Sequence, residues 1–200
     1  MSKFLIYAAV YLLFLTISCN RAAVSGEVLP GEFLFSLDIG VLENEIDLFH
    51  RGGTLPEERN SVFMYRGIIF IANSLGNKIM EFSSYGDLIS LIYNAEENPR
   101  PLLLSSSPRE GNIVNKAAHS FPFRNIGEIS VSSENVLLVT DTAAPGQEGF
   151  DLETGAAFQH IIHRFTSEGD YLDYIGQEGV GGTPFSFIVS MNVTARNELV

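Results

Sequence analysis

The sequence is poor in the residues that stabilise small exported domains covalently. It has one cysteine, Cys19, and no tryptophan. A single cysteine allows no disulfide within the chain, so a folded domain must depend on packing. Apolar residues make up 46% of the chain, which is enough for a buried core and argues against disorder.

Common catalytic motifs are also missing. The sequence has no Gly-x-Ser-x-Gly elbow and no Ser-x-x-Lys arrangement with partners. The glycine-rich stretch 176–182 lacks the lysine of a phosphate-binding loop and the strand-to-helix setting of a dinucleotide site, so it is interpreted as a link between structural units. We therefore predict no catalytic residue and no cofactor.

Basic residues are few, with 12 against 24 acidic residues and a formal net charge of −12. This charge disfavours nucleic acid and anionic lipid surfaces as direct partners. We expect no nucleic-acid partner, and we expect any membrane contact to come from a covalent lipid. An acidic surface is also a common route to solubility.

Two groups of residues suggest metal binding until their spacing is considered. His160 and His163 fall in a predicted strand, where residues three apart point to opposite faces and cannot share one ion. Glu43, Glu45 and Asp47 alternate along another predicted strand and could bind calcium. A solvated outer face is favoured there, because calcium loops add glycine-rich turns and further oxygens. We predict no metal site.

The N-terminus has the pattern of an export signal. Lys3 precedes an apolar run over residues 4–17, which Ser18 and Cys19 follow. The run is shorter than the roughly 20 residues of a membrane-spanning helix, so a permanent span is disfavoured. We predict a signal helix within residues 1–18 and a tether over residues 19–30.

The residues before the cysteine carry a resemblance. Leu15-Thr16-Ile17-Ser18-Cys19 resembles the lipobox of bacterial lipoproteins, although Thr16 stands where many of them have leucine. The resemblance implies cleavage before Cys19, diacylation of its thiol with fatty acids such as palmitate, and stable anchoring in the cell envelope. The anchored protein would face the periplasm or the cell surface. An ordinary secretory signal is the alternative.

Comparison of the chain with itself shows an internal repeat. Residues 70–74 and 79–87 recur as residues 138–142 and 162–170. Each copy predicts two strands, a Gly-Asp turn and a further apolar strand. Gly86 and Gly169 stand where a short hairpin needs a residue that tolerates positive φ. An antiparallel meander follows.

A third, partial copy extends the pattern, since residues 191–200 match residues 129–138. The spacing between copies exceeds the roughly 40 to 50 residues of a plain propeller blade. Insertions over residues 94–120 and 143–158, both expected to be loops, account for the excess. The sequence is thus expected to end inside a blade.

These residues resemble a known family. Residues 67–87 are similar to the NHL repeat, a four-stranded propeller blade, and residues 139–141, 164–165 and 175–179 look like the next blade. Residues 85–93 also resemble an uncharacterised spirochaete lipoprotein family built on such propellers. The resemblance implies an all-β partial propeller over residues 31–200, with about three to four antiparallel blades and an incomplete ring. Truncation is the favoured explanation; a gap filled by a partner and an open stack of sheets are the alternatives.

The same resemblance implies a role for Asn73 and Asp141, which hold equivalent positions at the ends of strands. In such blades an acidic residue commonly braces the following turn. The alternative is a ligand-binding position in a central funnel.

The predicted function is a membrane-anchored extracytoplasmic lipoprotein with a binding or scaffolding module, whose partner is another envelope protein or a small ligand. The first alternative is a propeller hydrolase or lyase, which predicts that His119, His163, Asp141 and another carboxylate converge. The second is a non-functional product of a truncated gene.

Overall fold

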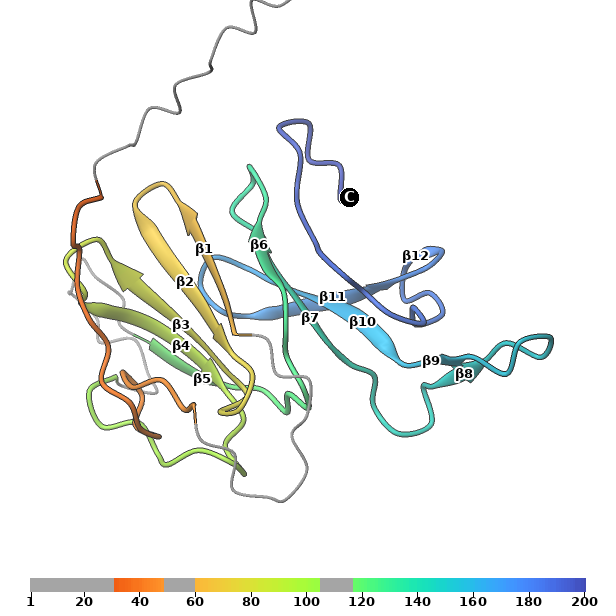
Figure 1. The fold of residues 1–200 in the computed structure, drawn as a ribbon, viewed down its shortest axis with the longest axis horizontal. Coiled ribbons are helices and arrows are strands. Elements are labelled where there is room, and N and C mark those ends of the chain that lie inside the picture. The colour runs from red at the N-terminus through yellow and green to blue at the C-terminus, as the bar shows by residue number, and fades with distance from the viewer. Residues whose placement is uncertain (1–30, 49–59, 105–116) are drawn as a thin grey trace, which may run out of the picture. The chain divides into compact units, whose positions relative to one another are not determined.

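The computed structural model describes residues 31–48, 60–104 and 117–200. The chain divides into two compact units, residues 1–33 and 34–200, and the second contains all the strands considered below. Across the described ranges the fold is all-β, with two larger open sheets and one small hairpin (Figure 1). No described helix is long and apolar enough to cross a membrane. The predicted signal helix and Cys19 lie outside the described residues.

The first sheet has the strand order β1-β2-β3-β4-β5. Strands β1 to β4 form an antiparallel meander, and β5 adds in parallel to β4. The bounds are β1 Ser61–Tyr65, β2 Ile68–Asn73, β3 Lys78–Ser83, β4 Leu88–Tyr93 and β5 Ala117–Ser120. Strand β5 belongs to an insertion that we expected to be a loop, so that expectation was wrong for its last four residues.

The second sheet has the order β12-β11-β10-β7-β6, and all its neighbours are antiparallel. A separate hairpin, β8 with β9, lies in the insertion between β7 and β10, which was also expected to be a loop. The bounds are β6 Ile129–Val131, β7 Leu137–Thr142, β8 Gly149–Phe150, β9 Ala157–Phe158, β10 His160–Phe165, β11 Tyr171–Gly176 and β12 Gly179–Val180.

The predicted meander is confirmed in both sheets, and its irregularities repeat as well. The register shifts between Glu81 and Phe82 in β3, and between Arg164 and Phe165 in β10. The turn that follows contains a glycine in the left-handed region in each case, with φ of 85° at Gly86 and 90° at Gly169. A side chain at either glycine would be strained and would also collide with a neighbouring ring.

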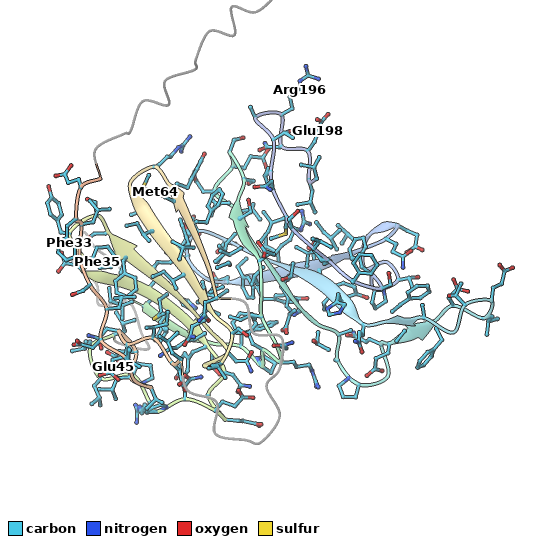
Figure 2. The ribbon with its side chains drawn as sticks, viewed as in Figure 1. Phe33, Phe35, Glu45, Met64, Arg196 and Glu198 are labelled. Atoms are coloured by element: carbon cyan, nitrogen blue, oxygen red, sulfur yellow. The ribbon has the colours of Figure 1, made fainter. Side chains whose placement is uncertain are left out.

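Apolar side chains from the two sheets share one core. Phe70, Ile79 and Ile92 of the first sheet pack with Val139 and Phe165 of the second. The opposite face of the first sheet is covered by the preceding segment, which carries Phe35 (Figure 2). The Phe35 ring lies 5.5 Å from the Phe82 ring, between centroids. Alternate residues of each strand therefore point to different cores, as the pleat of a strand requires.

The last residues form a hairpin that resembles the β6–β7 connection. Val193 bridges Leu199, and Asn197 has a φ of 61°, close to the 62° of Asn135 in the earlier hairpin. The two turns are in contact, because the Ser133 amide donates to Asn197 Oδ1 at 2.9 Å. The turns β1–β2 and β6–β7 and the last hairpin point to the same end of this unit (Figure 1).

The strand predicted over the acidic residues 43–47 is absent. A turn occupies this region, in which the Glu45 amide donates to the Leu42 carbonyl and the Ile46 amide donates to the Asp38 carbonyl. Glu43 is buried rather than solvated, and its carboxylate accepts the backbone amides of Leu102 and Leu103. The regular alternation in the sequence is therefore not a strand pattern here.

Candidate functional site

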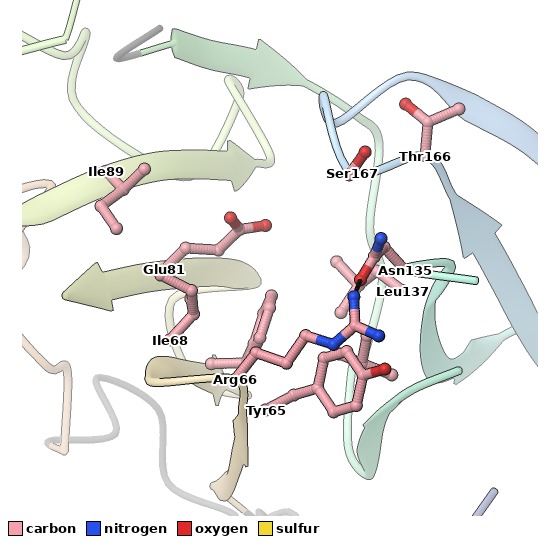
Figure 3. Close-up of a pocket in the computed structure, with 11 residues that line it drawn as sticks. Tyr65, Arg66, Ile68, Glu81, Ile89, Asn135, Leu137, Thr166 and Ser167 are labelled. Carbon is pink, nitrogen blue, oxygen red and sulfur yellow. Dashed lines mark hydrogen bonds between the residues drawn. The ribbon is translucent and has the colours of Figure 1, made fainter. Parts of the chain in front are cut away.

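A cavity of about 300 Å³ lies between the first and second sheets (Figure 3). Its walls are largely apolar, and its polar groups come from four turns or strands. The first sheet contributes Tyr65, Arg66, Ile68, Phe70, Glu81 and Ile89, and the second contributes Val131, Asn135, Leu137, Thr166 and Ser167.

Hairpin turns position the polar groups at the edge of this cavity. Arg66 occupies the β1–β2 turn with a φ of 51°, and Asn135 occupies the β6–β7 turn. The Arg66 guanidinium donates to Asn135 Oδ1 at 3.3 Å and lies 5.0 Å from the centre of the Tyr65 ring. The turns of two different sheets thus meet at the cavity.

Glu81 is the principal chemical feature of the site. It extends from β3 with its carboxyl group directed toward the second sheet (Figure 3), and only 8% of the residue is exposed. Burial raises the pKa of the Glu81 carboxyl from 4.5 to about 7. Among the described residues, no side chain forms an ion pair or hydrogen bond with this carboxyl.

At the equivalent position in the second sheet, the charge is neutralised by a residue of the neighbouring strand. Glu81 lies opposite Ser90 across the β3–β4 ladder, while Arg164 lies opposite Asp173 across β10–β11. Arg164 Nε and the terminal nitrogen donate to the two Asp173 oxygens at 2.5 and 2.6 Å. This bidentate bond holds the pKa of Asp173 below its ordinary value. The first sheet has a buried acid with no matching base.

Asn73 and Asp141 each accept backbone amides, but the prediction that they brace the following turn was wrong, because each holds the segment that precedes its sheet's first strand. Asn73 Oδ1 accepts the Asp47 amide at 3.0 Å. Asp141 Oδ1 accepts the Asn125 amide at 2.7 Å and also the amide of Thr142. Neither residue lines the cavity between the sheets.

The histidines do not converge. His163 Nε2 lies 3.3 Å from Asp141 Oδ2, whereas His119 Nδ1 lies 4.0 Å from Asp170 Oδ1. His163 is buried and His160 is only partly buried, as expected for residues three apart on β10. Over the described ranges, no three or more His, Cys, Asp or Glu side chains are grouped for a metal ion. The cluster predicted by the enzyme hypothesis is not formed.

The His163–Asp141 pair lies in an aromatic core. The His163 ring is 4.9 Å from that of Phe121 and 5.6 Å from that of Tyr171. Its Nδ1 is buried and has no hydrogen-bond partner within the described part of the chain. Asp141 also accepts the backbone amides of Arg124 and Asn125, so the pair links β10 to the segment that precedes β6.

A second buried charge, Lys78, holds the acidic turn. Its ammonium donates to the Leu42 carbonyl at 2.6 Å, and only 1% of the residue is exposed. Burial lowers the pKa of Lys78 to about 8, and Asp47, Glu45 and Glu43 partly oppose this change. The three carboxylates singled out in the sequence thus act electrostatically on a lysine of the chain itself.

Sequence reasoning missed Glu81 as a site residue, although a signal was present. The alternation in β3 places Glu81 on the same side as Ile79, which is fully buried in the core between the sheets. A charged residue on the same face of a strand as a core residue is either buried with it or exposed where the strand leaves the core. The position of the second sheet decides between these two cases.

The fold and the site together define the class as an all-β protein of open antiparallel sheets, with a buried acid in a cavity between two of them. No protein-family model matches the chain, and no curated protein matches it.

Proposed function

We propose that the protein is an extracytoplasmic lipoprotein whose β-structured part is a binding module, built as a partial propeller of NHL-like blades. The observation that carries this proposal is the cavity between two sheets of repeated construction. Its volume of about 300 Å³ is at the lower end of the range for small-molecule sites. A few polar groups among apolar walls are typical of such sites.

Three features support the propeller interpretation. Two meanders share the same strand order, the same register shift and the same glycine turn. They pack face to face through an apolar core. The hairpin of residues 192–200 then lies against the β6–β7 turn as the first half of a further blade, with Ser133 bound to Asn197.

A binding role is favoured over the enzyme alternative by the distribution of reactive groups. The imidazoles and carboxylates that an acid–base site needs are divided between two pairs, one of them buried among aromatic rings. The cavity itself contains one acid and no histidine. Such a lining can orient a ligand, but it brings no imidazole to Glu81.

The anchoring part of the proposal is tested at Cys19. Mass spectrometry of the mature N-terminus, after growth with labelled palmitate, is expected to find acylated Cys19 as the first residue. A Cys19→Ser variant should carry no label. Recovery of the wild-type protein from the cytosol, with residues 1–18 attached and no lipid, would refute the anchoring.

The binding part is tested by ligand-induced stabilisation of the full-length, detergent-solubilised chain. A ligand that binds only the native state raises the unfolding temperature. Replacing Ser167 with phenylalanine at the cavity should abolish this stabilisation without unfolding the protein. An equal effect in wild type and Ser167→Phe would place binding elsewhere.

A further inference from the structure

We propose that the cavity between the sheets binds a small organic ammonium ion, with the Glu81 carboxylate as its counter-ion. This proposal rests on the binding function proposed above and specifies the chemistry of its ligand. Three observations carry it: a buried acid with no partner among residues 31–48, 60–104 and 117–200, a largely apolar wall, and the contrast with the equivalent position of the second sheet.

The first observation is that no residue in the described ranges matches the charge of Glu81. A carboxylate withdrawn from water is costly unless it is paired or hydrogen-bonded. Glu81 is 92% buried, since 8% of it is exposed, and no described residue pairs with it. It lines a cavity of about 300 Å³, which has room for a ligand group beside the acid.

The second observation is the character of the walls. Ile68, Phe70 and Ile89 lie on the same sheet as Glu81, and Val131 and Leu137 face them from the other sheet. Such walls favour a ligand with an alkyl or aromatic group. They offer few oxygen atoms to coordinate a metal ion or to hydrogen-bond with water. A cation with an apolar body satisfies both the acid and the walls, which a simple inorganic cation does not.

The third observation is the contrast between equivalent positions. In the second sheet the place of Glu81 is taken by Arg164, which is neutralised across the ladder by Asp173. In the first sheet the cross-strand residue is Ser90, which carries no charge. The fold can therefore accommodate an internal ion pair at this position, and the first sheet has none.

The other charged or titratable groups of the lining are Tyr65 and Arg66. Arg66 is exposed and is held by Asn135, and it forms no ion pair with Glu81. Ser167 offers a hydroxyl oxygen to a remaining proton of an ammonium group, whereas Thr166 Oγ1 already accepts the amides of Glu168 and Asp170. Burial alone raises the pKa of Glu81 to about 7, so an ammonium ion competes with a proton for the same carboxyl near neutral pH.

The test uses n-butylammonium as the probe and 1-butanol as its neutral match, each titrated into the full-length chain at pH 8 and 150 mM salt. Salt at this concentration screens the general attraction of an acidic protein for cations. We expect the ammonium to bind roughly tenfold to hundredfold more tightly than butanol, as a charge-assisted hydrogen bond allows. Glu81→Gln should remove that preference.

A control and a pH series sharpen the result. Glu96→Gln removes an exposed carboxylate from the loop after β4 and should leave binding unchanged. The wild-type affinity should fall by about tenfold per pH unit below pH 7, because the proton must leave before the cation binds. Ser90→Lys, which supplies an ammonium from the chain, should weaken binding while the thermal transition shows that the variant is folded.

The outcomes separate this proposal from the one on which it rests. Equal binding of butylammonium and butanol, or ammonium binding unchanged in Glu81→Gln, would overturn the ammonium proposal and leave a neutral-ligand cavity. Failure of ammonium, alcohol and butyrate probes alike to bind or stabilise the wild-type chain would overturn the binding function of the cavity itself.

Discussion

The two sheets have the same construction but different charges at one equivalent position. In the second sheet, Arg164 and Asp173 neutralise each other across neighbouring strands. In the first sheet, Glu81 faces Ser90 beside a cavity, and nothing in the part of the chain that the structure describes pairs with it. The difference teaches that strand order, bulge and turn are set by features that both copies share. The chemistry of the cavity is set by a single cross-strand pair that they do not share.

The sheets also differ in the aromatic residues that surround the bulge. Phe82 and Phe165 follow the register shift in β3 and β10 and are both almost fully buried. Within the described ranges, Phe82 has one ring neighbour, Phe35. Phe165 has four, because Phe121, Phe123, Tyr171 and the imidazole of His163 surround it. We therefore infer that aromatic packing stabilises the second sheet more than the first.

The largest effect expected from this comparison is that of Phe165→Ala. Loss of a buried phenylalanine leaves a cavity and costs about 3–5 kcal/mol of unfolding free energy. We expect Phe165→Ala at the upper end of this range and Phe82→Ala at the lower end, because fewer rings contact Phe82. Urea unfolding of both variants measures the two costs. A greater loss for Phe82→Ala would contradict the inferred difference between the sheets.

The unpaired acid predicts a pH dependence that is specific to the first sheet. The pKa of Glu81 is raised from 4.5 to about 7 by burial. Between these values the folded chain keeps a proton that the unfolded chain has lost, so the unfolding free energy falls as pH rises through this window. The loss is about 3 kcal/mol at most, complete above about pH 7 and absent below about pH 4.5.

Glu81→Gln is expected to remove this slope and to be more stable than wild type at pH 8. Unfolding of both proteins at several values between pH 4.5 and 8 measures the effect, and Glu96→Gln is the control that keeps the slope. Parallel pH profiles for wild type and Glu81→Gln would show that the carboxyl is neutralised in some other way.

The repeated meander could be predicted from the sequence because its signals are local. Gly86 and Gly169 mark turns that need positive φ, and both turns have it. The strands around them alternate or are rich in β-branched and leucine residues, which is enough to place the hairpins. Equivalence of Asn73 with Asp141 also followed from the repeat, although both accept amides of a preceding segment and not of the following turn that the sequence predicted.

The features that could not be predicted depend on distant parts of the chain. Strand β5 pairs in parallel with β4 after a long connection, so no turn signal links the two. The row Glu43, Glu45 and Asp47 alternates like a strand, but the buried Lys78 favours a turn that brings carbonyls to its ammonium. Glu81 likewise becomes a cavity residue only because the second sheet covers it.

The smallest predicted effect concerns the ion pair Arg164–Asp173 of the second sheet. Arg164 and Asp173 are each about 30% exposed, so solvent screens their attraction. We expect Arg164→Met to cost less than about 1 kcal/mol at pH 7, even though the pair is bidentate. The pKa of Asp173 is lowered chiefly by its hydrogen bond with Arg164. The stabilisation is therefore present above the ordinary pKa of aspartate and is lost as pH falls through the lowered value.

A double-mutant cycle with Asp173→Asn isolates this contribution, and its pH dependence should run opposite to that of Glu81. The coupling of the Arg164–Asp173 pair grows as pH rises from strongly acid values, whereas Glu81 destabilises the fold as pH rises toward 7. A coupling as large as the Glu81 effect would mean that the second sheet depends on its ion pair. The contrast between a structural pair and an unmatched acid would then no longer separate the two sheets.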